Sequence, residues 1–185
     1  MSESEAQSRI IQFLRADIAD YKGRWLIDLQ TLADYKLERA HDVMQWMFPT
    51  DIRSENQPAS PVLTEFDIFN LKNNVRARLA IKRSLDRMIR FYENNTYWIT
   101  QKNHNFKRIT RILRCLWLAD LKHDYVSLQK CLDDVFTENV DVIGEEVFMY
   151  WKNANNFAYL MEKRDGAKRK IAPKDDREHN LEMFL

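Results

Sequence analysis

Apolar residues recur every three or four positions along most of the chain, the spacing that places them on one face of an α-helix. The pattern predicts a first helix capped by Ser2 or Ser4 that stops near Gly23, and a second helical stretch, broken or continuous, from Trp25 to Met47. Further helices are expected at about 64–71, 74–94, 105–116, 125–136 and 145–164. Since no strand-like alternation is long enough to interrupt them, we expect an all-α fold of about six to eight helices.

Turn residues agree with this interpretation. The 185 residues include only 3 Gly and 4 Pro, whereas sheet-rich folds need many tight turns. Thr64 and Asp67 are a capping pair for a helix whose apolar side is Phe66, Phe69 and Leu71. Residues 49–61 are the one clear loop, and Gly144 and Gly166 are expected helix stops. We therefore expect one compact, bundle-like domain over residues 1–166 and a partly ordered or flexible tail over 167–185.

Composition narrows the class of protein. Hydrophobic residues make up 45% and charged residues 31%, a balance typical of a globular protein. No apolar run approaches the roughly 18 residues of a membrane-spanning helix, and the polar N-terminus does not resemble a secretory signal, so a cytoplasmic protein is expected. Cys115 and Cys131 are interpreted as reduced packing residues, with a mutual disulfide as the alternative.

The net charge of +1 gives no overall attraction to nucleic acid or anionic membranes. Local basic stripes are nevertheless predicted on the outward edges of two helices. One consists of Arg76, Arg83, Arg87 and Arg90, and the other of Lys107, Arg111, Arg114 and Lys122. Side by side, the two would form a continuous basic patch that binds an anionic surface or nucleic acid; otherwise they are ordinary solvated helix faces.

Two stretches carry a resemblance to a known family. The first contains a spaced His and then Gln-Trp-aliphatic-Phe-Pro, with the matching positions Leu37, Glu38, His41, Gln45, Trp46, Phe48 and Pro49. The second, residues 104–113, reads His-Asn followed by Arg-Ile-Thr-Arg-Ile-Leu. Between them lie Pro-Val-Leu-Thr at 61–64 and Phe-Tyr at 91–92. In these pieces, spread over residues 31–136, the chain resembles the conserved N-terminal region of the opioid growth factor receptor family.

The resemblance implies a peptide- or protein-binding module without catalytic activity. Animal members of the family are described as receptors for the peptide Met-enkephalin that restrain cell growth, found at the nucleus and membrane as well as in the cytoplasm. This chain lacks their C-terminal repeats, and we expect a compact, domain-only relative, a form compatible with a bacterial source. The oligomeric state is left open.

The matches at polar and aromatic positions give the candidate binding residues His41, Gln45, Trp46, His104, Asn105, Arg108 and Arg111. Trp46 either lines a groove for an aromatic residue of a peptide or anchors the core. Arg108 has two interpretations as well. It bonds helix-end carbonyls or a carboxylate such as Glu38 and ties the two stretches together, or it presents its guanidinium fork to a carboxylate of a bound peptide, as Arg111 would.

The sequence contains no Gly-rich phosphate loop, no nucleophile elbow and no His-Glu-x-x-His motif. Glu38 with His41, and Asp120 with His123, are carboxylate-x-x-His pairs of the kind that hold metal ions in helical bundles, where further inward carboxylates are also needed. A metal-dependent enzyme is therefore the third hypothesis, after peptide binding and anionic-surface binding. We predict no enzymatic activity, no cofactor and no metal.

Overall fold

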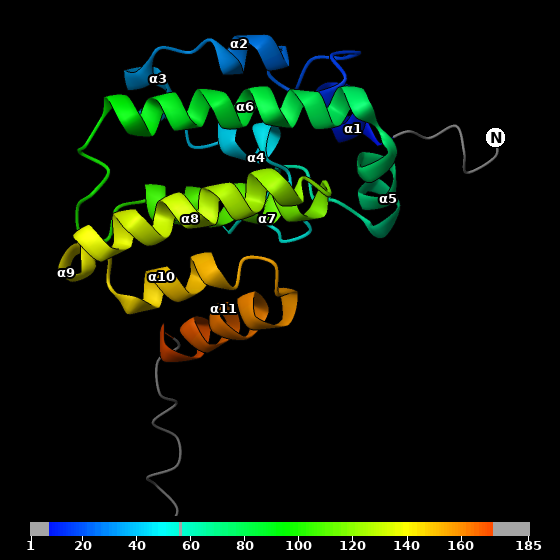
Figure 1. The fold of residues 1–185 in the computed structure, drawn as a ribbon. Coiled ribbons are helices and arrows are strands. Elements are labelled where there is room, and N and C mark those ends of the chain that lie inside the picture. The colour runs from blue at the N-terminus through cyan, green and yellow to red at the C-terminus, as the bar shows by residue number, and fades with distance from the viewer. Residues whose placement is uncertain (1–7, 56, 172–185) are drawn as a thin grey trace, which may run out of the picture. The chain divides into compact units, whose positions relative to one another are not determined.

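The computed structural model describes residues 8–55 and 57–171, which contain eleven helices and no strand (Figure 1). Six of these helices have seven or more residues, and the predicted all-α class is confirmed. The chain divides into two compact units, residues 1–155 and 156–185. The second unit is represented in the described residues by α11 (Phe157–Ile171), and the prediction of a domain that ends at residue 166 stays a prediction.

The first unit begins with four short helices and continues with longer ones. The short helices are α1 (Arg9–Leu14), α2 (Leu26–Gln30), α3 (Asp34–Arg39) and α4 (Val43–Met47). The others are α5 (Glu65–Asn73), α6 (Val75–Asn94), α7 (Asn105–Leu118), α8 (Lys122–Glu138), α9 (Val140–Ile143) and α10 (Glu145–Lys152). The stretch 25–47, whose continuity the sequence left open, is thus three separate helices.

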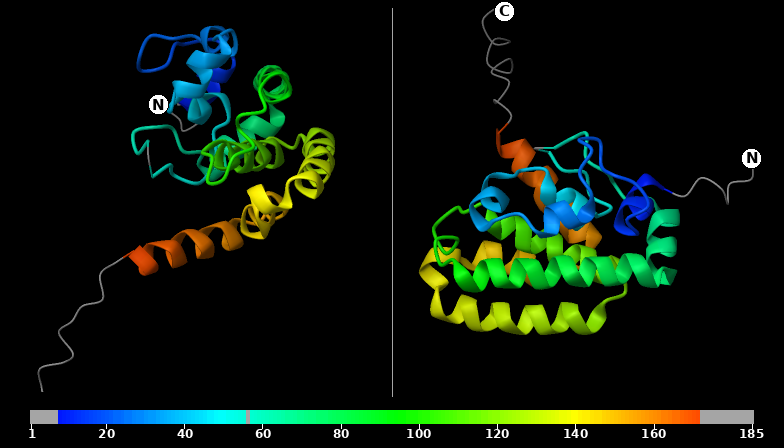
Figure 2. Two further views of the ribbon diagram at one scale, coloured as in Figure 1. Left: turned by 90° about the vertical axis from the view of Figure 1, so that its left-hand side faces the viewer. Right: turned by 90° about the horizontal axis from the view of Figure 1, so that it is seen from above.

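Helix α7 lies at the centre of the first unit. Its inward residues Ile109, Ile112, Leu113 and Leu116 are at most 1% exposed, as their spacing predicts. It packs against α5, α8 and α10. Helix α6 packs against α1, α2 and α5, and α2 and α3 lie on the opposite side of α6 from α8 (Figures 1 and 2). This arrangement brings residues 20–42 near the N-terminal half of α7.

The first helix is shorter than predicted. Ser8 accepts a hydrogen bond from the amide of Ile10 and caps α1, whereas the expected caps Ser2 and Ser4 lie outside the described residues. The helix ends at Leu14, and Ala16 has a φ of 59°, a left-handed conformation that cannot continue an α-helix. The following residues form a loop, in which Tyr21 is 55% exposed.

Two other expectations were wrong. Phe66 and Phe69 on α5 are 49% and 65% exposed, because the buried edge of this helix is formed by Asp67 and Leu71, one turn apart. The expected last long helix is interrupted after Lys152, where α10 ends, and α11 then continues past the predicted stop at Gly166.

The remaining expectations concern membranes and cysteines. None of the described helices is long and apolar enough to cross a bilayer. Cys115 is buried and Cys131 is exposed, and both are free thiols. The alternative of a mutual disulfide is therefore excluded, and only Cys115 packs in the core. The apolar residues Leu181, Met183, Phe184 and Leu185 of the tail lie outside the described residues.

Candidate functional site

The two family-like stretches meet where the end of α3 faces the start of α7. Arg108 is buried, and its Nη1 donates to the Glu38 carboxylate at 3.2 Å. Its Nη2 donates to the backbone carbonyls of Glu38 and Ala40 at 2.9 and 3.2 Å. Asn105 Nδ2 donates to both oxygens of the same carboxylate at 3.2 and 3.1 Å. The geometry matches the first interpretation of Arg108, as a tie between the two stretches.

Arg111 has a similar structural position. Its guanidinium donates to the carbonyls of Phe48 and Ile52 at 3.2 and 3.4 Å. Burial lowers the pKa of Arg111 to about 10, which leaves the group charged at neutral pH. The N–H groups of Arg111 that were proposed to bind a ligand thus donate to backbone carbonyls at the end of α4 and in the loop after it.

Gln45 and Trp46 are also inside the protein. With its amide oriented to satisfy both ends, Gln45 donates to the carbonyls of His41 and Asp42 at 3.0 Å each and accepts from Ser54 Oγ. Trp46 is 5% exposed and packs edge-on against Phe13, with ring centroids 4.9 Å apart. Trp46 is therefore a core residue and does not line an open groove.

His41 and His104 are the two candidates that reach the surface. Their ring centroids lie 6.2 Å apart, and His104 Nε2 lies 3.3 Å from the Glu38 carboxylate. Burial, together with the charge of Arg108, lowers the pKa of His104 below its ordinary value of 6.5. His104 is therefore mostly neutral at pH 7, whereas His41 is exposed and borders the pocket described next.

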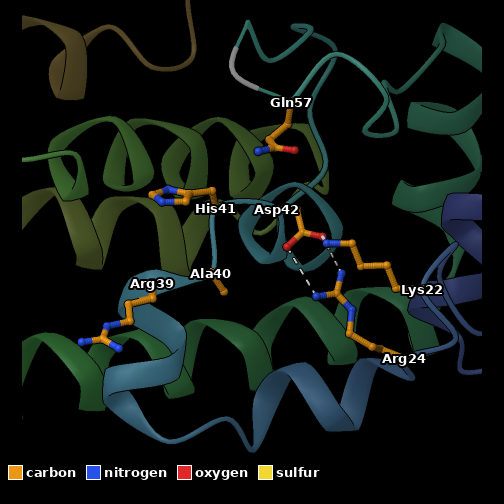
Figure 3. Close-up of a pocket in the computed structure, with 7 residues that line it drawn as sticks. All are labelled: Lys22, Arg24, Arg39, Ala40, His41, Asp42 and Gln57. Carbon is orange, nitrogen blue, oxygen red and sulfur yellow. Dashed lines mark hydrogen bonds and ion pairs between the residues drawn. The ribbon is translucent and has the colours of Figure 1, made fainter.

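A shallow pocket of about 440 Å³ opens between the end of α3, the loop before α2 and the loop after α4 (Figure 3). Its lining consists of Lys22, Arg24, Arg39, Ala40, His41, Asp42 and Gln57. Four of these, from Arg39 to Asp42, belong to the first family-like stretch. The segment 38–42 therefore takes part in two features: it lines the pocket, and its backbone carbonyls accept hydrogen bonds from the buried Arg108.

Asp42 organises one wall of the pocket. It accepts hydrogen bonds from Arg24 Nη2 at 2.8 Å and from the Tyr21 hydroxyl at 3.0 Å, and Lys22 Nζ lies 2.8 Å away. Burial alone would raise the pKa of Asp42, but the bonds from Arg24 and Lys22 outweigh it and lower the pKa to about 2. The buried Asp20 carboxylate also binds Arg24, with its Oδ2 2.6 Å from Arg24 Nη2. Two carboxylates thus balance the two cations Arg24 and Lys22, and this wall is nearly neutral.

The opposite wall carries unbalanced positive charge. In Figure 3 the side chains of Arg39 and His41 point to the same side, away from the Asp42 ion pairs. Arg39 is exposed and forms no ion pair with the described residues. Tyr35, 61% exposed, lies one turn before Arg39 on α3, and the exposed Tyr21 borders the other wall. Neither tyrosine is among the lining residues, but Tyr21 bonds the lining residue Asp42 and Tyr35 is on the same helix as Arg39. The guanidinium of Arg39 is free to bind an anionic group.

The predicted basic stripes are only partly present. Arg87 is buried and bonds Asp34 at 2.7 Å and the carbonyl of Leu32 at 2.6 Å. Arg114 is buried and pairs with Asp51, and Arg111 is bonded as described above. The exposed basic residues are Arg76, Arg83 and Arg90 on α6, Lys107 on α7 and Lys122 on α8. Because Arg87, Arg111 and Arg114 are engaged inside the protein, the alternative of a continuous patch formed by both complete stripes is not supported.

The two carboxylate-x-x-His pairs do not form on helix faces. His41 lies beyond the end of α3, and Glu38 is bonded to Arg108 and Asn105. Asp120 lies in the turn between α7 and α8 with a φ of 55°, while His123 is on α8. Within the described part of the chain, no group of three or more His, Cys, Asp or Glu side chains is arranged to hold a metal ion.

Sequence reasoning missed Lys22, Arg24, Arg39, Asp42 and Gln57 as pocket residues. Arg39 and Asp42 lay within the family-like stretch but at positions without a family match, and Lys22 and Arg24 lie where no resemblance was seen. Comparisons with protein-family models, with curated protein sequences and with solved structures gave no match for this chain.

Proposed function

We propose that this chain is a non-enzymatic peptide-binding module that resembles the opioid growth factor receptor domain, and that its site is the pocket beside α3. The observation that carries the proposal is the position of this pocket on residues 39–42, with Arg39 unpaired among the described residues. Two exposed tyrosines are close by: Tyr21 bonds the lining residue Asp42, and Tyr35 precedes Arg39 by one turn of α3. Tyr, Trp and Arg are the side chains enriched at protein-binding hot spots.

The chemistry of the pocket indicates the kind of peptide. A guanidinium binds a carboxylate through charge-assisted hydrogen bonds, and the two tyrosines offer apolar surface to an aromatic or aliphatic side chain. The ligand is thus a short segment that presents a carboxylate next to an apolar residue. Met-enkephalin, the peptide that the resemblance suggests, has aromatic residues and a free C-terminal carboxylate, so it is a suitable first probe.

Isothermal titration calorimetry with Met-enkephalin and with its C-terminal amide tests the proposal. We expect the free acid to bind at least 10-fold more tightly than the amide, and Arg39→Gln to lose a similar factor, about 1.4 kcal/mol. Lys107→Gln is the matched control, because Lys107 is an exposed cation on α7 that does not line the pocket. Equal affinity of acid and amide, or of the parent and Arg39→Gln, would contradict the assignment of the pocket.

A further inference from the structure

Charge is segregated along this chain in a way that the near-zero net charge conceals. Residues 131–151 contain six carboxylate side chains and no Lys, Arg or His. Residues 75–90, which belong to α6, contain six basic side chains and the single acid Asp86. Two helical regions of opposite charge therefore occur in one molecule whose total is +1.

The basic surface is the outward face of α6. Arg76, Arg83 and Arg90 recur every seven residues and are exposed, so they follow one edge of the helix at intervals of about 10.5 Å. Arg83 and Arg90 have no ion pair or hydrogen bond with the described residues. Beside them Val75 and Leu79, one turn apart, are 67% and 48% exposed. We call these five residues the α6 face.

The acidic surface lies where α8 ends, α9 follows and α10 begins. These three helices pack against one another and meet at one end of the first unit (Figures 1 and 2). The exposed carboxylates here are Glu138, Asp141, Glu145 and Glu146, none of which is paired with another described residue. Val140 and Met149 nearby are 44% and 45% exposed. We call these six residues the acidic corner.

The two surfaces complement each other. On the α6 face Arg83 and Arg90 have no partner in the described chain, whereas Arg76 donates to the carbonyl of Arg15 and lies 3.7 Å from Asp17. The four carboxylates of the acidic corner also have no partner there, the signs are opposite, and each surface has two exposed apolar side chains. Within the described residues no ion pair joins Arg83 or Arg90 to the acidic corner, so the charges of one molecule do not neutralise each other. Association between molecules would bring opposite potentials together and cover the apolar residues.

We propose that the α6 face of one molecule binds the acidic corner of a second copy of this chain. The contact is heterologous, because two different surfaces meet, and a pair of molecules leaves one acidic corner free on the first and one α6 face free on the second. Since both surfaces are small and largely charged, the association is weak and sensitive to salt. Nucleic acid fits the α6 face less well, because Asp86 lies on the same exposed face and would repel phosphates, and because phosphates make no use of Val75 and Leu79.

Sedimentation velocity of the full chain at several concentrations tests this inference. At an ionic strength of about 20 mM we expect the average mass to rise above the 22.3 kDa monomer as concentration increases. At about 0.5 M salt, where the screening length falls to a few ångströms, we expect monomer. A parent protein that stays monomeric at low salt up to about 1 mM would overturn the proposal, as would association that salt does not weaken.

Charge reversal identifies the surfaces. The basic-face variant carries Arg83→Glu with Arg90→Glu, and the acidic-corner variant carries Glu138→Lys with Asp141→Lys. Each alone should be monomeric, and an equimolar mixture should associate again, because the reversed α6 face of one now complements the reversed corner of the other. A control with Lys36→Glu and Lys107→Glu has the same change in net charge as the basic-face variant, but on exposed residues outside both surfaces. It should still associate at low salt.

Circular dichroism melting of the same variants shows whether each remains folded, and we expect shifts of no more than a few degrees because all four sites are exposed. A folded pair of variants that stays monomeric when mixed would overturn the complementarity between the α6 face and the acidic corner. Binding of the parent to a 20-base-pair DNA duplex at low salt, in place of self-association, would assign the α6 face to nucleic acid instead.

Discussion

Arg108 shows how a charged residue can be fixed by the fold and not by a ligand. Its guanidinium binds the carbonyls of Glu38, on α3, and of Ala40, just after the helix, and pairs with the Glu38 carboxylate at the same time. The sequence is compatible both with an internal bond from Arg108 to Glu38 and with a bond from Arg108 to a ligand, because the same guanidinium N–H groups would donate in either case. The choice depends on where α3 ends relative to α7, which is a property of the tertiary structure.

Replacing Arg108 by Gln should therefore destabilise the protein. The change leaves the Glu38 carboxylate and two helix-end carbonyls without these donors in a buried environment, and we expect a loss of about 1–3 kcal/mol and a melting temperature lower by several degrees. Lys107→Gln, on the adjacent exposed position, should change stability by less than about 0.5 kcal/mol. If Arg108→Gln melts like the parent, the tie does not contribute to stability.

Asp42 gives the protein a defined response to acid. Its pKa is lowered from 3.8 to about 2, so the folded state favours the charged carboxylate more than the unfolded state does. This contribution is complete above about pH 4 and disappears as pH falls through about 2. Asp42→Asn should be less stable than the parent at pH 7 and should lose less stability between pH 4 and 2, as measured by urea unfolding at each pH. Parallel curves for the two proteins would disprove the assignment.

At the scale of elements, the long helices follow from their apolar spacing, and the short ones do not. α6, α7 and α8 occupy the ranges that the period predicts, because three or more turns give a clear stripe. Residues 9–47 also have helical spacing, but Ala16 adopts a left-handed conformation and the Asp20 carboxylate binds the amides of Lys22 and Arg24 at 2.8 and 2.9 Å. Such a side-chain-bonded loop competes with a helix and leaves no periodic signal.

The start of α5 is an element that local sequence does determine. Thr64 Oγ1 accepts from the amide of Asp67 at 3.2 Å, and the Asp67 carboxylate accepts from the amide of Thr64 at 2.8 Å. Thr64→Ala removes one half of this reciprocal cap and should cost about 1 kcal/mol in chemical unfolding. Thr96→Ala, at an exposed position outside the helices, is the control and should be close to neutral. Equal effects of the two changes would show that the cap is not needed.

At the scale of the whole molecule, the all-α class follows from composition and from the helical spacing of apolar residues. The position of the pocket beside α3 does not follow from either. The motifs drew attention to residues 37–49, yet Gln45 and Trp46 are buried and the pocket uses their neighbours Arg39 and His41. Two more lining residues, Lys22 and Arg24, come from a loop about 20 residues away. The packing of α3, α4 and α7 determines which polar residues face solvent. Helical spacing alone cannot predict that a charged residue such as Arg87 or Arg114 is buried.

The most direct test of the peptide-binding proposal is a titration of ¹⁵N-labelled protein with Met-enkephalin, followed by amide chemical shifts. The account predicts saturable shifts that cluster at residues 22–24 and 39–42, little change along α8, and loss of these shifts in Arg39→Gln. No saturable shifts at millimolar peptide, or shifts that cluster away from the pocket, would contradict the proposal that this pocket binds a peptide.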